Sequence, residues 1–119
     1  MTKEEFLSKV TTASGSNETV IEIETMYGNI SLPEVVKKII SLSEDSIFFE
    51  EDKRLLSKKE ILEASKDLHV DFVKKGLIPL IDALDNDFIS FSIISKKWCF
   101  YNIIEDCIFS EASDIAKLL

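Results

Sequence analysis

The sequence predicts an α+β protein with a single, mainly antiparallel sheet and helices packed against it. Three observations support this fold class. The first third of the chain carries helix start signals followed by apolar residues at helical spacing. The densest β-forming sequence lies in residues 77–109. Short polar segments separate the β-rich runs within that block, which is typical of antiparallel hairpins rather than parallel crossovers.

The N-terminal segment predicts two helices around a polar break. Thr2-x-x-Glu5 is a capping box, so a short helix is expected to run to about Thr12. The residues at 14–17 then form a loop or a mobile hinge. A second helix over residues 17–28 is preferred to a strand, although Ile21, Ile23 and Thr25 alternate as strand residues would, because Asn17 is a good N-cap and Gly28 a good stop.

The strongest helix signal follows. Ser31-x-x-Glu34 is a second capping box with Pro33 in the first turn, and the polar run at 43–46 is expected to end this helix. A short strand is expected at 47–49. The acids Glu50, Glu51 and Asp52 come next, with Lys53 and Arg54 directly behind them; the favoured interpretation of this charged stretch is a solvated turn, and the alternative is a binding feature.

A further helix is predicted to start at Ser57-x-x-Glu60, the third capping box, and to continue through Leu68. Two lysines and Gly76 then have the composition of a cationic helix end with a glycine cap.

The block at 77–109 predicts the sheet. In the first strand, at 77–81, Pro79 is expected at an edge or a strand end, where its missing N–H does no harm. A half-buried strand over 88–94 places alternate apolar residues on one face and Ser90 and Ser92 on the other. A loop at 95–97 leads to a strand at 98–102, and 107–109 adds a short strand. Finally, a last helix is capped by Ser110 or Ser113 and packs Ile115 on the sheet.

Length and composition predict one domain over residues 1–119, with an N-terminal helix and hinge at 1–16 and the core at 17–119. The 22 acids and 14 bases give a formal net charge of -8, which argues against nucleic acid or anionic membrane as a partner and favours a basic protein surface.

Because no apolar run has the length of a signal or membrane segment, a cytoplasmic location is expected. Cys99 and Cys107 are interpreted as thiols, with a disulfide between them as the less favoured alternative.

Sequence motifs for catalysis are nearly absent. Three glycines are too few for a dinucleotide or phosphate-binding loop, and one histidine with two cysteines makes no zinc motif, so no catalytic residue, cofactor or metal site is predicted. His69 is assigned to packing or capping ahead of a role as general base, and Cys99 to the core ahead of a nucleophile. An enzyme remains the least favoured of three functional hypotheses.

Asp82, Asp85 and Asp87 form a polar cluster beside the β-rich block. They lack the glycine and the third oxygen ligand of a calcium loop, so the favoured interpretation is a connection between strands, followed by partner binding. If the chain binds a basic partner, the candidate contacts are the six acids Glu50, Glu51, Asp52, Asp82, Asp85 and Asp87.

Several motifs together resemble the SUKH superfamily, the cell-wall-assembly-regulator-like domains. The run Ile21-Glu22-Ile23-Glu24 to Gly28, followed by Leu32-Pro33-Glu34-Val35-Val36-Lys37-Lys38-Ile39-Ile40, is similar to its N-terminal signature. Ile78-Pro79-Leu80 leading through Asp85-Asn86-Asp87 into Phe88-Ile89 is similar to its second signature, and Ser110-Glu111-Ala112-Ser113 to its closing element. The chain departs from the superfamily at Asn86, where members usually carry glycine, which affects loop geometry more than fold.

The resemblance covers residues 18–119 and implies a compact sheet with packed helices and no enzymatic activity. It further implies an immunity protein that binds a cognate bacterial toxin, often a nuclease, or, as in eukaryotic relatives, a regulatory interaction protein. The leading hypothesis is therefore a cytoplasmic immunity protein that neutralises a basic toxin domain, and the alternative is a general regulatory or scaffolding domain without a toxin partner. The sequence leaves the oligomeric state open.

Overall fold

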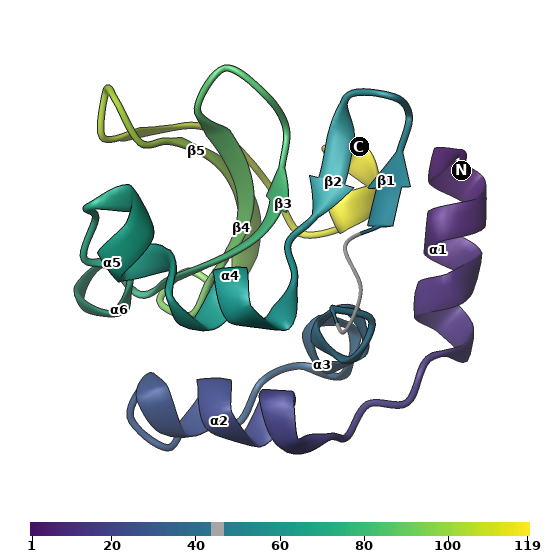
Figure 1. Ribbon diagram of the computed structural model, residues 1–119, viewed down its shortest axis with the longest axis horizontal. Coiled ribbons are helices and arrows are strands. Elements are labelled where there is room, and N and C mark those ends of the chain that lie inside the picture. The colour runs from purple at the N-terminus through teal and green to yellow at the C-terminus, as the bar shows by residue number, and fades with distance from the viewer. Residues whose placement is uncertain (44–46) are drawn as a thin grey trace.

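The fold is built on one open sheet of six antiparallel strands in sequence order, as the sequence predicted for the α+β class (Figure 1). The computed structural model describes residues 1–43 and 47–119. Each strand pairs with the next along the chain, so the sheet is a meander. Its strands are β1 (Ile47–Phe49), β2 (Lys53–Leu55), β3 (Leu77–Asp82), β4 (Asp87–Ser92), β5 (Lys97–Asn102) and β6 (Cys107–Ala112).

Three N-terminal helices pack on one side of this sheet: α1 (Lys3–Thr12), α2 (Glu18–Met26) and α3 (Glu34–Ser41). The capping box at Thr2 is confirmed, because its side chain and that of Glu5 each accept a hydrogen bond from the other residue's backbone N–H. The choice of helix over strand for residues 17–28 is also confirmed: Asn17 caps α2, and Gly28 follows it with φ 98°.

The predicted capping box at Ser31 is wrong. The helix begins two residues later than that pattern requires, with Pro33 at the N-cap and no side-chain cap hydrogen bond. Pro33 has ψ 153°, which is extended backbone and places it before the helix rather than in its first turn. The Leu32 N–H instead donates to the Glu24 carboxylate of α2 at 2.8 Å. The predicted stop at 43–46 falls mostly outside the described residues.

The single helix predicted from Ser57 is also wrong, because the segment forms three short helices: α4 (Lys58–Leu62), α5 (Ala64–Leu68) and α6 (Phe72–Lys75). The Ser57 capping box itself is present. The chain leaves helical geometry at Glu63, and His69 adopts a left-handed conformation with φ 56°. These breaks let Ala64 and Phe72 both reach the sheet, where they are buried with Leu77, Cys99 and Tyr101. Gly76 ends α6 in left-handed geometry, as predicted.

Both faces of the central strands are therefore covered, and the prediction of a half-buried strand at 88–94 is wrong. Ser90 and Ser92, expected to face solvent, are 0% and 7% exposed. They line the face on which Phe72 and Ala64 pack, whereas Ile89 and Phe91 belong to the larger core beneath α1–α3. Strand β4 ends at Ser92, so the hairpin loop is residues 93–96 rather than 95–97.

Pro79 lies in the interior of β3 rather than at a strand end, but on a part of β3 that has no ladder partner on the β2 side, which fits the predicted edge position. The neighbouring strand β2 reaches only the last two residues of β3, Ile81 and Asp82, and the pairing with β4 shifts register between Pro79 and Ile81. A bulge next to the proline is a position where its missing donor is tolerated.

The C-terminal segment differs from prediction in two ways. Strand β6 runs to Ala112 and so contains Ser110, which therefore caps no helix. The last helix is a single 3₁₀ turn over Ile115–Lys117, and its N-cap is Asp114 rather than Ser110 or Ser113. Ile115 is buried in the core as expected. Both cysteines are free thiols, and the alternative disulfide is not formed.

Candidate functional site

The three hairpin turns β1–β2, β3–β4 and β5–β6 lie at one end of the sheet. The register shows this, because Arg54 pairs with Asp82, Asp82 with Phe88, and Asn102 with both Asp87 and Cys107. Figure 1 shows the first two turns side by side at the top of the molecule. We call this the acidic end, and it carries eight acids: Glu50, Glu51, Asp52, Asp82, Asp85, Asp87, Glu105 and Asp106.

The β1–β2 turn holds its acids in a fixed and unusual backbone geometry. Glu50 and Glu51 have φ of 53° and 60°, a conformation that costs a residue with a Cβ about 1–2 kcal/mol. Contacts to the start of α1 hold the turn in place: the Glu50 N–H donates to the Met1 carbonyl at 2.9 Å, and the Lys3 N–H donates to the Glu50 carboxylate. The turn is exposed, so the carboxylate of Glu51 faces solvent.

The β3–β4 turn is built by its own polar groups, as the connection interpretation of this cluster predicted. Leu84, Asp85 and Asn86 have consecutive positive φ angles of 72°, 51° and 66°. The Leu84 N–H donates to Asp82 at 3.0 Å. From the adjacent strand, the Asn102 side-chain amide donates to the Asp87 carboxylate at 2.9 Å and to the Asp85 carbonyl at 3.2 Å. The carboxylate of Asp85 is left at the surface.

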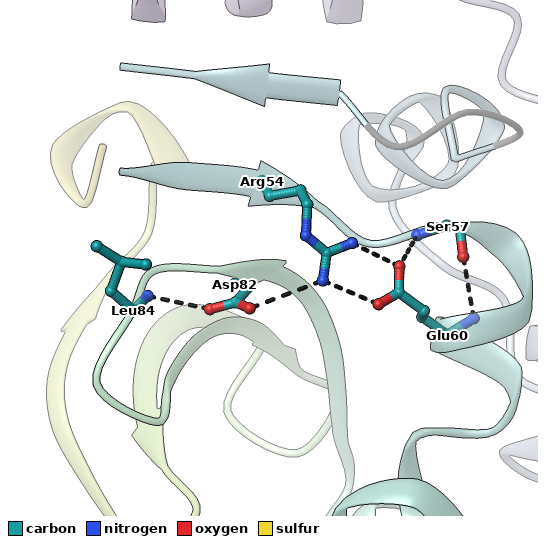
Figure 2. A network of polar contacts seen from close by, with 5 residues as sticks. All are labelled: Arg54, Ser57, Glu60, Asp82 and Leu84. Carbon is teal, nitrogen blue, oxygen red and sulfur yellow. Dashed lines mark hydrogen bonds and ion pairs between the residues drawn. The ribbon is translucent and has the colours of Figure 1, made fainter. Parts of the chain in front are cut away.

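Asp82 also takes part in an ion-pair network centred on Arg54 (Figure 2). The Arg54 guanidinium contacts both oxygens of Glu60, at 2.6 and 2.8 Å, and lies 3.7 Å from Asp82. This fork, together with the Ser57 N–H at 3.0 Å, lowers the pKa of Glu60 to about 2. The network fastens β2 to α4 and β3, so Asp82 is a positioning residue of the turn rather than a free surface charge.

The space beside this network is too small for a drug-sized ligand. Its volume is about 130 Å³, against roughly 300–1,000 Å³ for such pockets, and its polar lining is Arg54, Glu60, Asp67 and Asp82. No group of three or more histidines, cysteines or carboxylates that could hold a metal ion occurs in the described part of the chain.

Glu105 and Asp106 of the β5–β6 turn were not among the sequence candidates. Asp106 accepts a hydrogen bond from the Tyr101 hydroxyl, and its Oδ1 lies 2.7 Å from Lys75 Nζ. The contact with Lys75 and, to a smaller extent, the hydrogen bond from Tyr101 lower the pKa of Asp106. The signal was available in the sequence, because these acids separate two predicted strands, and alternate turns of a meander fall at the same end of a sheet.

In the described part of the chain, three basic side chains form ion pairs with the acidic end: Lys53 with Asp52, Arg54 with Asp82, and Lys75 with Asp106. Counting Glu60, which shares Arg54 with Asp82, nine carboxylates face these three bases, which leaves a local excess of six negative charges. The structure thus brings together all six acids predicted from the sequence, but it divides them into exposed charges and residues that shape the turns. Among 1–43 and 47–119, Asp85 and Glu51 form no ion pair.

Neither residue weighed for catalysis lies at the acidic turns. His69 is exposed and is the C-cap of α5, which is one of the two roles, packing or capping, predicted for it. Cys99 is 1% exposed. Its burial and, to a smaller extent, the negative charge of Glu111 raise its pKa to about 11, so it is a protonated thiol at neutral pH. Within residues 1–43 and 47–119, no helix has the length and apolar character needed to cross a membrane.

Comparisons with known proteins add no relative: no family model, curated protein or solved structure matches the chain.

Proposed function

We propose that this protein is a non-enzymatic, cytoplasmic protein-binding domain that neutralises a basic bacterial toxin domain, such as a nuclease, by binding to it. The observation that carries the proposal is the convergence of three acidic hairpin turns at one end of the sheet. A nuclease presents a basic surface to its substrate, and an acidic protein can compete for that surface. The net charge of -8 also favours binding to a basic partner, because electrostatic attraction accelerates association.

The rigidity of these turns supports a binding role. Backbone and side-chain hydrogen bonds hold residues with positive φ in both the β1–β2 and the β3–β4 turn, so the backbone that carries the exposed carboxylates needs no further ordering. A preorganised surface loses less conformational entropy when a partner binds. The proposed contacts are Glu51, Asp85 and Glu105, while Glu50, Asp82 and Asp87 hold the turns in shape.

The resemblance to SUKH immunity proteins supplies the toxin as the class of partner, and the acidic end supplies the surface. The alternative, a regulatory or scaffolding domain, uses the same surface for a different partner. A toxin-like reading frame next to the gene would favour the immunity role.

The test is co-purification of the tagged protein from its native host, followed by titration of any basic partner at rising salt. We expect a one-to-one partner whose toxicity the protein abolishes and whose affinity falls steeply with ionic strength. Neutralising two exposed acids, Glu51→Gln with Asp85→Asn, should weaken binding by about tenfold, mainly through slower association.

A matched control removes two exposed acids elsewhere, Glu18→Gln with Glu34→Gln at the starts of α2 and α3. It loses the same charge but lies away from the acidic end, so its affinity should change little. If both double variants lose the same affinity for the partner, the acidic end would contribute only through the net charge of the protein and not as a contact surface. Recovery of a partner that is not toxic would favour the regulatory alternative.

A further inference from the structure

The last strand, β6, leaves one side of its backbone open. Cys107–Ala112 is six residues long and, within the described residues, pairs only with β5. Two of its large apolar side chains are solvent-exposed, Ile108 at 44% and Phe109 at 55%. An exposed edge strand offers a row of backbone donors and acceptors to which another strand can pair.

A groove runs beside this edge on the α6 face of the sheet. It has a volume of about 410 Å³, with Leu77, Ile94 and Ile108 among its apolar lining residues. Glu111, which also lines it, is exposed and forms no ion pair among the described residues, whereas Asp106 is paired with Lys75. The groove thus offers apolar surface near Ile108 and an uncompensated carboxylate at Glu111.

Two features decide against a second copy of this chain as the occupant. The pairing of β6 with β5 shifts register between Phe100 and Tyr101, so Phe109 is an extra residue that bulges the edge and hinders long, flat edge-to-edge pairing. A second copy would also bring another net charge of -8. A short segment of opposite charge is not repelled, and it needs only a few backbone pairs on either side of the bulge rather than a long, flat edge.

We propose that β6 accepts an added strand from a basic partner protein, with an apolar side chain opposite Ile108 and a lysine or arginine opposite Glu111. Ile108 and Glu111 pair with Tyr101 and Cys99, which are two apart in β5, so both project to the groove side. The added strand therefore carries its apolar and basic side chains on one face. The basic character of the partner rests on the proposed function, whereas the open edge and groove do not.

The β5–β6 turn joins this edge to the acidic end, because Asp106 belongs to the acidic end and also lines the groove. A partner seated on the acidic end can therefore extend a segment along β6. Main-chain pairing along the edge would add affinity that does not depend on salt, in contrast to the contacts of the acidic end.

The test uses the full chain, labelled with ¹⁵N, and the end-blocked six-residue peptide Thr-Val-Thr-Lys-Thr-Val as the probe, in which the valines and the lysine alternate with threonine and so lie on one face of a strand. The control peptide has the same sequence with N-methyl groups on alternate backbone nitrogens, which removes pairing donors and keeps the charge. We expect amide shifts in residues 107–112, binding of the control about tenfold weaker, and a two- to fivefold loss of affinity in Glu111→Gln.

Three results would overturn the proposal. Shifts confined to the turns at 50–52, 83–86 and 103–106 would indicate electrostatic binding at the acidic end alone, which leaves the proposed function intact. Equal binding of both peptides, or of neither, would exclude main-chain pairing at β6. Shifts at 107–112 that depend on protein concentration without peptide would identify a second copy as the occupant. Failure to find a toxin would contradict the proposed function without changing the peptide result.

Discussion

The two edges of the sheet differ in length and in cover. Strand β1 has three residues, and α1 runs beside it (Figure 1), stacking Phe6 on Phe49 with ring centroids 4.2 Å apart. Strand β6 has six residues, and its Phe109 is 55% exposed. Helix α1 therefore packs along one edge of the sheet, whereas β6, at the other edge, pairs only with β5 among the described residues. An edge left open in a stable sheet is where a partner strand can add.

The largest expected effect comes from removing the cover of β1. Phe6 is 1% exposed and anchors α1 to the sheet. Phe6→Ala leaves a cavity between α1 and β1 and should lower the free energy of unfolding by about 3–5 kcal/mol, measured by urea denaturation.

The matched control is Phe109→Ala at the open edge, which makes the same chemical change on an exposed side chain. Its effect should stay within about 0.5 kcal/mol. Similar losses for both variants would contradict the contrast between a covered and an open edge.

A smaller, pH-dependent effect is expected where β2, the neighbour of β1, is fastened to α4. The hydrogen bonds from Arg54 hold the pKa of Glu60 at about 2, below its ordinary 4.5. Because the folded-state pKa is the lower one, the stabilisation is complete above about pH 5 and is lost as the pH falls toward 2. Glu60→Gln should cost about 1 kcal/mol at pH 7, a figure reduced for the partial exposure of both side chains.

The measurement is urea denaturation of the wild type and Glu60→Gln between pH 7 and pH 3. The difference between their free energies of unfolding should become smaller as the pH falls. Glu34→Gln, which changes an exposed acid of α3, should shift stability by no more than about 0.5 kcal/mol at either pH. If the difference in the free energy of unfolding between the wild type and Glu60→Gln stays constant with pH, the ionisation of Glu60 does not contribute to folding stability.

The smallest effect on stability is expected from placing a charge on the open edge. Ile108→Lys at a 44% exposed position should change the free energy of unfolding by less than about 0.5 kcal/mol. Lysine on an edge opposes strand addition, so this variant should also lose affinity for the valine–lysine peptide, measured by titration. Retained affinity would mean that the peptide does not contact the β6 edge.

Local signals in the sequence predicted much of the fold. The capping pattern at Thr2 and the cap at Asn17 place helices correctly because a side chain within three residues satisfies the free N–H groups of the first turn. The same reasoning failed at Ser31, where the backbone geometry of Pro33 delays the helix start. Strand β2 was not predicted, because Lys53 and Arg54 are polar and give no strand signal of their own. Only pairing with neighbouring strands places them in the sheet.

The candidate site was predicted in its residues but not in its arrangement. The acids at 50–52 and 82–87 are visible in the sequence as two separate groups. The meander brings them to the same end of the sheet and adds Glu105 and Asp106. The role of Asp82 could not be predicted, because its partner Arg54 lies 28 positions earlier and meets it only through the pairing of β2 with β3.

The sequence by itself determined the α+β class, the acidic charge and the local starts of most helices, because composition and short-range capping act within a few residues. The tertiary structure decided which faces of the sheet are buried, which acids are held in ion pairs and which edge is left open. These depend on contacts between distant segments, such as Phe6 with Phe49 and Phe72 with Tyr101. A period-two pattern marks one face of a strand as apolar, but it cannot show that α5 and α6 return to cover Ser90 and Ser92 on the other.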